Sequence, residues 1–229
     1  DDEIEEFETI ALKIFLPFDT ELNIFSQDKN FLSKTKVDLK TIPKDKFPLL
    51  LNYHPLYLYK HQVLKQADTM LALLLLDYKE LDVLEDTFNY YEPITTHDSS
   101  LSKCIYSIVA FKLKKYDIAI KYFNEVLKTD YSNTHENTEH GLHVANLGGS
   151  YLGFVYGILG LRIHRGYLKI EPHKTKEIPG FTLNIKYQGE TITISFDEEL
   201  VIKTTGKVKL KIYDEIIDIS DTFKTVLPK

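Results

Sequence analysis

The chain has two parts with different hydrophobic periods. Up to about residue 160 apolar residues recur at helical spacing, and after that point they alternate with polar residues as in half-buried strands. Residues 17–52 follow neither period, so we expect a long loop there that wraps over other parts of the molecule. Helices are expected at 4–15, 54–78, 101–113, 117–129 and 142–160.

The segment 54–78 gives the clearest helical pattern, HPLYLYKHQVLKQADTMLALLLLDY. Pro55 suits a first helical turn, because the N–H that proline lacks has no partner inside the helix at that position. A broad apolar surface follows, and Lys65 and Gln66 fall near the middle of the segment. Judged from the pattern alone, these two residues belong to a polar stripe on a solvated face.

The segment 142–160, LHVANLGGSYLGFVYGILG, is apolar on nearly all sides. Such a pattern is typical of a helix buried within a larger assembly. Its five glycines, from Gly148 to Gly160, indicate close backbone packing or an interrupted helix. Five helices of this kind pack poorly as a simple bundle, so we expect them to form part of a larger helical barrel and the sequence to be incomplete.

Beyond Gly160 the alternating segments are separated by turn residues, as in a small antiparallel β domain of five to seven strands. The expected domain limits are 1–160 for the helical part and 161–229 for the β part. The alternating segments read LRIHRGYLKIEP, FTLNIKYQG, ETITISFDEE, LVIKTTGKVKLKIYD and EIIDIS.

Composition narrows the class of protein. Of 229 residues 43% are hydrophobic and 27% charged, and the net charge of -6, with lysines scattered among acids, argues against a nucleic-acid partner. Cys104 is the single cysteine, which excludes a disulfide within the chain and fits a reducing cytoplasm. The start, DDEIEEFE, lacks the features of a secretory signal, and the apolar run 70–76 is far shorter than the roughly 20 residues of a membrane span.

Residues 90–102, YYEPITTHDSSLS, concentrate hydroxyl, imidazole and carboxylate groups just before a helical pattern. Ser, Thr and Asp at such a place cap a helix, because their oxygens accept from the free N–H groups of the first turn. The same N–H groups with hydroxyl donors around them can also hold phosphate. Both interpretations stay open on the residues alone.

Three motifs, in this order and at these separations, resemble the disaccharide phosphorylases of glycoside hydrolase family 65. They are NYHPLYLYKHQVLKQADTMLALLL, YYEPITTHDSSLS and HENTEHGLHVANLGG, and the earlier stretch LPFDTELNIFSQDKNFL is similar as well. The resemblance implies an α+β multidomain protein. This chain would supply the C-terminal helices of an (α/α)6 barrel, followed by a small antiparallel β-sandwich domain.

The resemblance also implies a reaction. Such enzymes cleave an α-glucosidic bond with inorganic phosphate and invert the anomeric centre, giving β-glucose 1-phosphate and a second sugar. A carboxylic acid protonates the leaving oxygen while phosphate attacks from the opposite face. The implied partners are a disaccharide and inorganic phosphate, with no cofactor, no nucleic acid and no membrane. A homodimer, or association with an N-terminal part, is expected too.

The matching positions imply roles for particular residues. Lys65 and Gln66 would contact the glucose that loses its glycosidic partner. Ser99, Ser100 and His143 would bind phosphate, a protonated imidazole adding a charge-assisted donor. Four further residues would support the site: His97, Asp98, Gly148 and Gly149. The family commonly has an acidic residue just before Gly141, where this chain has His140, and the adjacent Glu139 is the alternative for the acidic partner of this loop.

The general acid implied by the family is a glutamate upstream of the Lys65–Gln66 motif, and residues 1–64 contain no matching motif. We therefore expect the chain alone to be inactive. Three other interpretations stay open. The chain could be a non-catalytic fragment that binds carbohydrate or phosphate, or a structural piece that stabilises a catalytic partner. It could also belong to a family 65 hydrolase that uses water in place of phosphate. The histidines of HENTEH match no zinc spacing, so no metal site is expected.

Overall fold

The computed structural model describes residues 2–133, 138–164 and 166–226. The chain divides into two compact units, one ending at Ser99 and one beginning at Ser100, and each unit is described by itself. This division falls inside the expected helical part. The domain limits 1–160 and 161–229 and the (α/α)6 barrel stay predictions.

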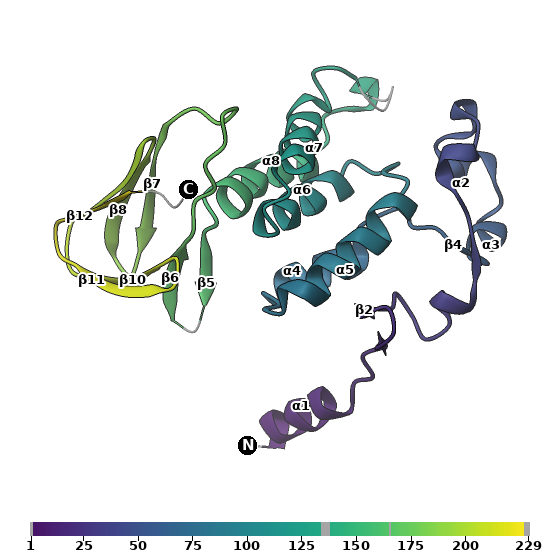
Figure 1. Ribbon diagram of the computed structural model, residues 1–229, viewed down its shortest axis with the longest axis horizontal. Coiled ribbons are helices and arrows are strands. Elements are labelled where there is room, and N and C mark those ends of the chain that lie inside the picture. Colours follow the sequence, from purple (N-terminus) through teal and green to yellow (C-terminus); the bar gives the residue numbers. More distant parts are fainter. Residues whose placement is uncertain (1, 134–137, 165, 227–229) are drawn as a thin grey trace. The chain divides into compact units, whose positions relative to one another are not determined.

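The first unit joins short helices and two-residue strands by extended segments (Figure 1). Helix α1 confirms the expected helix near the start of the chain, and it has no buried residue. Strands β1 and β2 pair antiparallel, and β3 and β4 pair parallel. The elements are α1 (Asp2–Lys13), β1 (Phe18–Asp19), β2 (Ile24–Phe25), η1 (Phe31–Ser33), β3 (Thr35–Lys36), η2 (Leu39–Thr41), η3 (Lys44–Lys46), α2 (Leu49–Asn52), α3 (Pro55–Leu58), β4 (His61–Gln62), α4 (Asp68–Leu75), α5 (Leu81–Tyr91) and η4 (Glu92–Ile94).

The single helix expected over 54–78 is wrong. Pro55 does lie in a first helical turn, that of α3, but the chain then extends through β4 before α4 begins at Asp68. The backbone N–H and carbonyl of Leu64 bond to another segment, which a helix would have prevented. Tertiary pairing thus overrides the local helical pattern, and Lys65 and Gln66 lie in the connection between β4 and α4.

In the second unit, the expected helical pair is confirmed as α6 (Ser102–Lys112) and α7 (Tyr116–Lys128). The other helical elements of this unit are η5 (Thr138–His140), α8 (Val144–Leu152) and η6, a π-helix (Gly153–Ile158). Helix α6 is buried along most of its length, which explains why its sequence is apolar on more than one face.

The segment 142–160 shows both features that its glycines indicate. The α-helical turns of α8 give way to the π-helical turns of η6 at Gly153, so the helix is interrupted. A Cβ at Gly157 would lie 2.8 Å from the ring of Phe111, too close for an ordinary contact. Gly160 has a φ of +60°, and a Cβ there would lie 2.1 Å from the carbonyl oxygen of Glu171.

The β part begins at Arg162, where the hydrophobic period changes. Its described residues form two four-stranded sheets with the orders β11-β10-β6-β5 and β12-β9-β8-β7. Their inward side chains share one apolar core, with Ile194, Leu200 and Leu210 fully buried. The strands are β5 (Arg162–His164), β6 (Tyr167–Ile170), β7 (Phe181–Tyr187), β8 (Glu190–Phe196), β9 (Glu199–Thr204), β10 (Val208–Ile212), β11 (Glu215–Ile219) and β12 (Thr222–Val226).

Two details of the β prediction are wrong. The described residues of the β part contain eight strands rather than five to seven, because the alternating segments 161–172 and 200–214 each form two strands and Thr222–Val226 forms one more. The arrangement is also not wholly antiparallel, since β10 pairs parallel with β6. Alternation predicts which side chains face the core, but strand direction depends on how distant segments pair.

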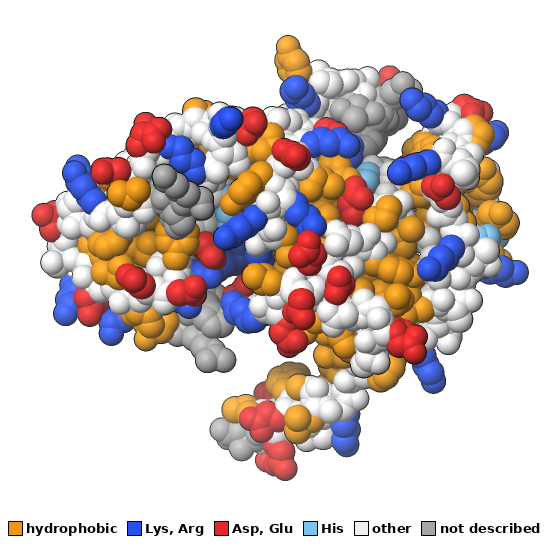
Figure 2. Space-filling model, in the orientation of Figure 1, with side chains coloured by type: hydrophobic (Ala, Val, Ile, Leu, Met, Phe, Trp, Pro, Cys, Tyr) orange, Lys and Arg blue, Asp and Glu red, His pale blue; other side chains and the backbone are white. Residues whose placement is uncertain are grey.

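The surface of the described residues carries both charge signs. On the face shown in Figure 2, Lys and Arg side chains are interspersed with Asp and Glu. Within the described part of the chain, none of the helices has both the length and the apolar character required to cross a lipid bilayer.

Candidate functional site

Two segments far apart in the sequence run side by side in the first unit. Leu64 and Thr95 form a parallel β-bridge. The N–H of Leu64 donates to the carbonyl of Ile94 at 2.9 Å, and the N–H of Thr96 donates to the carbonyl of Leu64 at 2.7 Å. The connection that carries Lys65 and Gln66 is therefore fixed against the segment that carries residues 95–99.

This pairing brings together four of the residues predicted to form the site. The Gln66 side chain donates through Nε2 to the Ser99 hydroxyl at 3.3 Å. Lys65 and Asp98 line the same small cavity of about 50 Å³, together with the backbone-paired residue Thr96. The rest of the cavity lining is apolar or aromatic: Leu49, Leu50, Leu58, Tyr59, Val63 and Leu64.

Asp98 and His97 shape the second of these segments. The Asp98 carboxylate accepts from the backbone N–H of Leu49, the first residue of α2, at 2.8 Å. The backbone N–H of Asp98 in turn donates to the Thr96 hydroxyl at 3.3 Å. His97 has a φ of +56°, an uncommon conformation for a non-glycine residue, so the chain turns sharply there.

The N-cap position of α6 itself is not occupied by one of the polar residues of this segment. The N-cap of α6 is Leu101, whose side chain has no oxygen to accept from the first turn. Ser100 precedes it and begins the second unit. The Asp98 carboxylate and the Ser99 hydroxyl bond to other segments of the first unit. The Thr96 hydroxyl accepts from the backbone of Asp98 within the same segment.

A buried glutamine anchors the strand that leads into the site. Gln62 is 2% exposed, and its Nε2 donates to the carbonyls of Leu32 and Lys34 at 3.0 and 2.9 Å. Its Oε1 accepts from the Tyr90 hydroxyl at 2.5 Å. Burial raises the pKa of Tyr90, which keeps that hydroxyl protonated as a donor. The local sequence pattern around Gln62 does not indicate this burial, which follows from the pairing of β4 with β3.

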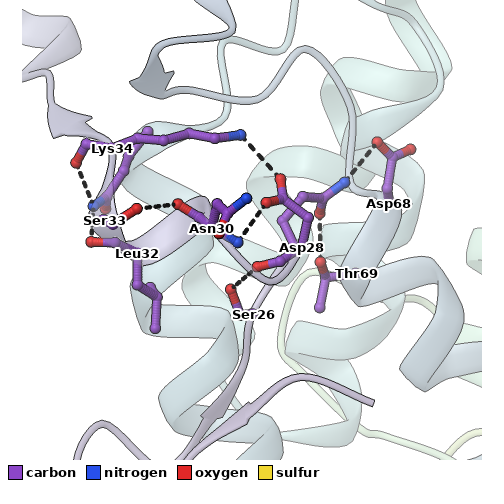
Figure 3. A network of polar contacts seen from close by, with 10 residues as sticks. Ser26, Asp28, Asn30, Leu32, Ser33, Lys34, Asp68 and Thr69 are labelled. Atoms are coloured by element: carbon purple, nitrogen blue, oxygen red, sulfur yellow. Dashed lines mark hydrogen bonds and ion pairs between the residues drawn. The ribbon is translucent and has the colours of Figure 1, made fainter. Parts of the chain in front are cut away.

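A second set of polar contacts fixes the start of α4 (Figure 3). The Gln27 side chain donates to the Asp68 carboxylate at 3.3 Å and accepts from the Thr69 hydroxyl at 2.5 Å. The same loop is closed by an ion pair of 2.9 Å between Asp28 and Lys34. Part of the irregular segment 17–52 therefore holds the element that follows Lys65 and Gln66.

His143, in the second unit, has a carboxylate partner that sequence reasoning did not find. Its ring Nδ1 lies 2.5 Å from Oδ1 of Asp130, and its backbone N–H donates to Oδ2 of Asp130 at 3.1 Å. His143 occupies the N-cap position of α8. The family commonly has an acidic residue just before Gly141, whereas the carboxylate that pairs with His143 is that of Asp130, two residues after the end of α7.

Gly148 and Gly149 lie in the second turn of α8. Backbone N–H groups in that turn are directed at carbonyls of the preceding turn. A Cβ at Gly149 would lie 3.0 Å from the sulfur of Cys104, which shows a close approach of α8 to α6. The structure thus favours helix packing for Gly149, and anion binding by these two glycines stays a prediction.

The histidine-rich stretch HENTEH is only partly described. His135 lies outside the described residues, and so does Glu136. Within the ranges that are described, no three His, Cys, Asp or Glu side chains gather in a way that could hold a metal ion.

Comparison with known proteins identifies the family. Residues 1–152 match the family model described as the central catalytic domain of glycosyl hydrolase family 65. The chain belongs to this family. The matched range includes every residue predicted above to contact sugar or phosphate.

Three of the similar curated proteins are disaccharide phosphorylases. The chain is 45% identical to an α,α-trehalose phosphorylase of Geobacillus stearothermophilus, with 96% of this chain and 30% of that protein covered. It is 38% identical to an α,α-trehalose phosphorylase of Thermoanaerobacter brockii (88% and 26% covered). It is 30% identical to a maltose phosphorylase of Bacillus subtilis strain 168 (93% and 29% covered). The chain thus spans less than a third of the length of these relatives.

The fold is shared with a solved structure that is described as a putative kojibiose phosphorylase from the human microbiome. The TM-score is 0.89 at 24% identity, over 99% of this chain and 31% of the other. At this identity the likeness bears on the fold of the covered part. It agrees with the mixture of helices and small sheets described above.

Proposed function

We propose that this chain is the C-terminal part of an inverting disaccharide phosphorylase that cleaves α,α-trehalose with inorganic phosphate. Family membership supports phosphorolysis as the reaction type, since the similar curated proteins named above are phosphorylases. Trehalose is favoured because both trehalose phosphorylases are more similar to this chain, at 45% and 38%, than the maltose phosphorylase, at 30%. The products would be β-glucose 1-phosphate and glucose.

In this proposal Lys65 and Gln66 hold the glucose whose glycosidic bond is broken. The ammonium group donates to sugar hydroxyls, and the amide both donates and accepts. Ser99, Ser100 and His143 hold phosphate with hydroxyl and imidazole donors. His97 and Asp98 support the segment that presents Ser99.

The observation that carries the proposal is the contact between Gln66 and Ser99. Its 3.3 Å hydrogen bond joins a proposed glucose-binding side chain to a proposed phosphate-binding side chain. Phosphorolysis requires this adjacency, because a phosphate oxygen must lie close to the anomeric carbon that it attacks.

The reaction balances with one acid and one nucleophile. A phosphate oxygen forms a bond to the anomeric carbon as the glycosidic C–O bond breaks, and the leaving oxygen takes a proton from a carboxylic acid. Phosphate is already anionic at neutral pH, so the bound nucleophile needs donors rather than a general base. We place the acid outside these residues and expect the 229-residue chain alone to release no glucose 1-phosphate.

The test is a hybrid protein in which this chain replaces the matching part of the Geobacillus stearothermophilus enzyme. We expect the hybrid to release β-glucose 1-phosphate from trehalose only when inorganic phosphate is present. Lys65→Met should lower kcat/KM for trehalose at least about 100-fold, since a donor to the reacting sugar is lost. The exposed lysine Lys29 supplies the control, and Lys29→Met should leave the rate unchanged.

Two results would contradict this proposal. Release of free glucose from trehalose at the same rate without phosphate would favour the hydrolase alternative. A folded hybrid that binds phosphate and trehalose but releases nothing would favour a non-catalytic role. Maltose and kojibiose, assayed in parallel, test the choice of trehalose.

A further inference from the structure

Asp130 holds His143 by two hydrogen bonds from one carboxylate. One oxygen accepts from the ring Nδ1 at 2.5 Å, and the other accepts from the backbone N–H of His143 at 3.1 Å. Both side chains are largely buried, 12% exposed for Asp130 and 21% for His143. The backbone contact fixes the position of His143, and the ring contact fixes its orientation.

The location of Asp130 is not explained by the helix that precedes it. It lies two residues beyond the end of α7, where the helix dipole disfavours a negative charge. The same carboxylate faces the N-terminal end of α8, where a negative charge is favoured. Its bonds to the N-cap residue of α8 therefore place this charge where the helix dipole favours it.

A neighbouring contact makes this arrangement rigid. Asn146, in the first turn of α8, is 2% exposed and donates through Nδ2 to the carbonyl of Val126 in the last turn of α7 at 2.9 Å. The end of α7 and the start of α8 are thus joined by the Asp130–His143 pair and by this buried amide. A ring held between two joined helix ends keeps its direction without help from a ligand.

We propose that Asp130 is a positioning residue, which fixes the His143 ring through Nδ1 so that Nε2 is the atom presented to phosphate. The role of His143 at phosphate rests on the proposed function, and the role of Asp130 goes beyond it. A carboxylate on Nδ1 selects the Nδ1-protonated form of the neutral ring. When the ring carries both protons, Nε2–H is a charge-assisted donor for an anion.

The first experiment reads the protonation state of the ring itself. The complete 229-residue chain is labelled with ¹⁵N-histidine, and the ring signals of His143 are assigned by comparison with His143→Gln. We expect the wild-type neutral ring to carry its proton on Nδ1. In the isosteric variant Asp130→Asn this pattern should be lost in favour of the Nε2-protonated form, and Asp130→Glu should restore it at least in part.

The second experiment adds inorganic phosphate to the same samples. We expect phosphate to shift the Nε2 signal of His143 more than Nδ1, and Asp130→Asn to weaken the apparent phosphate Kd about tenfold. Asp117→Asn, which removes an exposed carboxylate in the first turn of α7, should behave like wild type. Unchanged signals of the other histidines show that each variant is folded.

The outcomes separate the two proposals. An identical ring pattern in wild type and Asp130→Asn, or a phosphate response confined to Nδ1, overturns the positioning role. A ring pattern that depends on Asp130 but ignores phosphate supports the positioning role and overturns the proposed phosphate site.

Discussion

The β part and the paired site segments are held together by different forces. Between Arg162 and Val226, two sheets enclose a core of buried side chains such as Ile194 and Leu210, with few internal polar groups. In the first unit, the segments at 62–66 and 95–99 have little regular structure and are fixed by individual hydrogen bonds. Apolar packing is non-directional and summed over many contacts, whereas each hydrogen bond fixes one atom.

This difference predicts how each region responds to mutation. Loss of a core side chain should reduce the free energy of unfolding strongly, because a cavity is left behind. Loss of one hydrogen bond in the candidate site should reduce the free energy of unfolding less, but it should displace a group that the proposed reaction requires. Substitutions at Phe196, His173, Asp98 and Ser99 should test this contrast, with expected effects on stability that decrease in this order.

Phe196→Ala should have the largest effect. Phe196 is 1% exposed and its ring lies 5.2 Å from that of Phe181. We expect a loss of about 3–5 kcal/mol in the free energy of unfolding, measured by chemical denaturation. Ile216→Ala, at a side chain that is 55% exposed, is the control and should change the value by less than about 0.5 kcal/mol. Equal effects for the two variants would show that this core does not stabilise the protein.

His173 should make the second unit sensitive to acid. It is 8% exposed, stacks on Phe111, and burial lowers its pKa to about 4 from the usual 6.5, although Glu171 acts in the opposite direction. Between these values the unfolded chain binds a proton that the folded chain does not. Stability should therefore be complete above about pH 6.5 and fall as the pH drops toward 4, by at most about 3 kcal/mol.

The measurement is the free energy of unfolding between pH 7 and 4.5. The variant His173→Gln should lose this part of the pH dependence. Tyr116→Phe is the control, because it removes only the hydroxyl that lies 3.5 Å from Nδ1 and leaves the imidazole buried. A slope that is the same with and without His173 would contradict the prediction.

Asp98→Ala should open the site segment locally. The backbone N–H of Leu49 would lose its carboxylate acceptor, at a cost of about 1–3 kcal/mol. Hydrogen exchange of the Leu49 amide should accelerate about tenfold or more, while the amides of β8 stay unchanged. The exposed carboxylate of Asp45, close to Leu49 in sequence, provides the matched control Asp45→Ala. Unchanged exchange at Leu49 would show that Asp98 does not hold this segment.

Ser99→Ala should have the smallest effect on stability. It removes one neutral hydrogen bond of 3.3 Å to Gln66, worth about 0.5–1 kcal/mol. In the hybrid enzyme the same variant should raise the KM for phosphate at least about tenfold. Ser33→Ala, which removes an exposed hydroxyl bonded to the carbonyl of Asn30, should affect neither. If Ser99→Ala strongly reduced the free energy of unfolding and left the KM for phosphate unchanged, Ser99 would serve stability and not phosphate binding, against the prediction.

Much of the fold follows from local patterns. The α6–α7 pair and the change to strands after Gly160 were predicted correctly, since burial on one face imposes its period on the sequence. The segment 54–78 was predicted wrongly, because its apolar residues suit both a helix and two short helices joined by an extended piece. Pairing with Thr35 and Ile94, which lie far away in sequence, decides between them.

The site shows the same division. The motifs led to Lys65, Gln66, Asp98 and Ser99, and the structure places these four together in one unit. Two residues with structural roles beside the predicted ones were missed, Gln62 and Asp130. Each is a common polar residue whose neighbours in the sequence give no sign of its role. Gln62 is buried by contacts with residues near position 32, and Asp130 contacts His143, which lies 13 positions away.

The sequence by itself determined the family, the α6–α7 pair and the change from helices to strands after Gly160, and its motifs predict the side chains that would supply donors for sugar and phosphate. These properties depend on residue type and on spacings within one element, which are local. The tertiary structure alone decided that Leu64 pairs with Thr95, that β10 runs parallel to β6, and that Asp130 holds His143. These contacts join residues at least 13 positions apart. The physical reason is that a segment satisfies its backbone and buried polar groups with whichever partner packing brings near, and no local pattern specifies that partner.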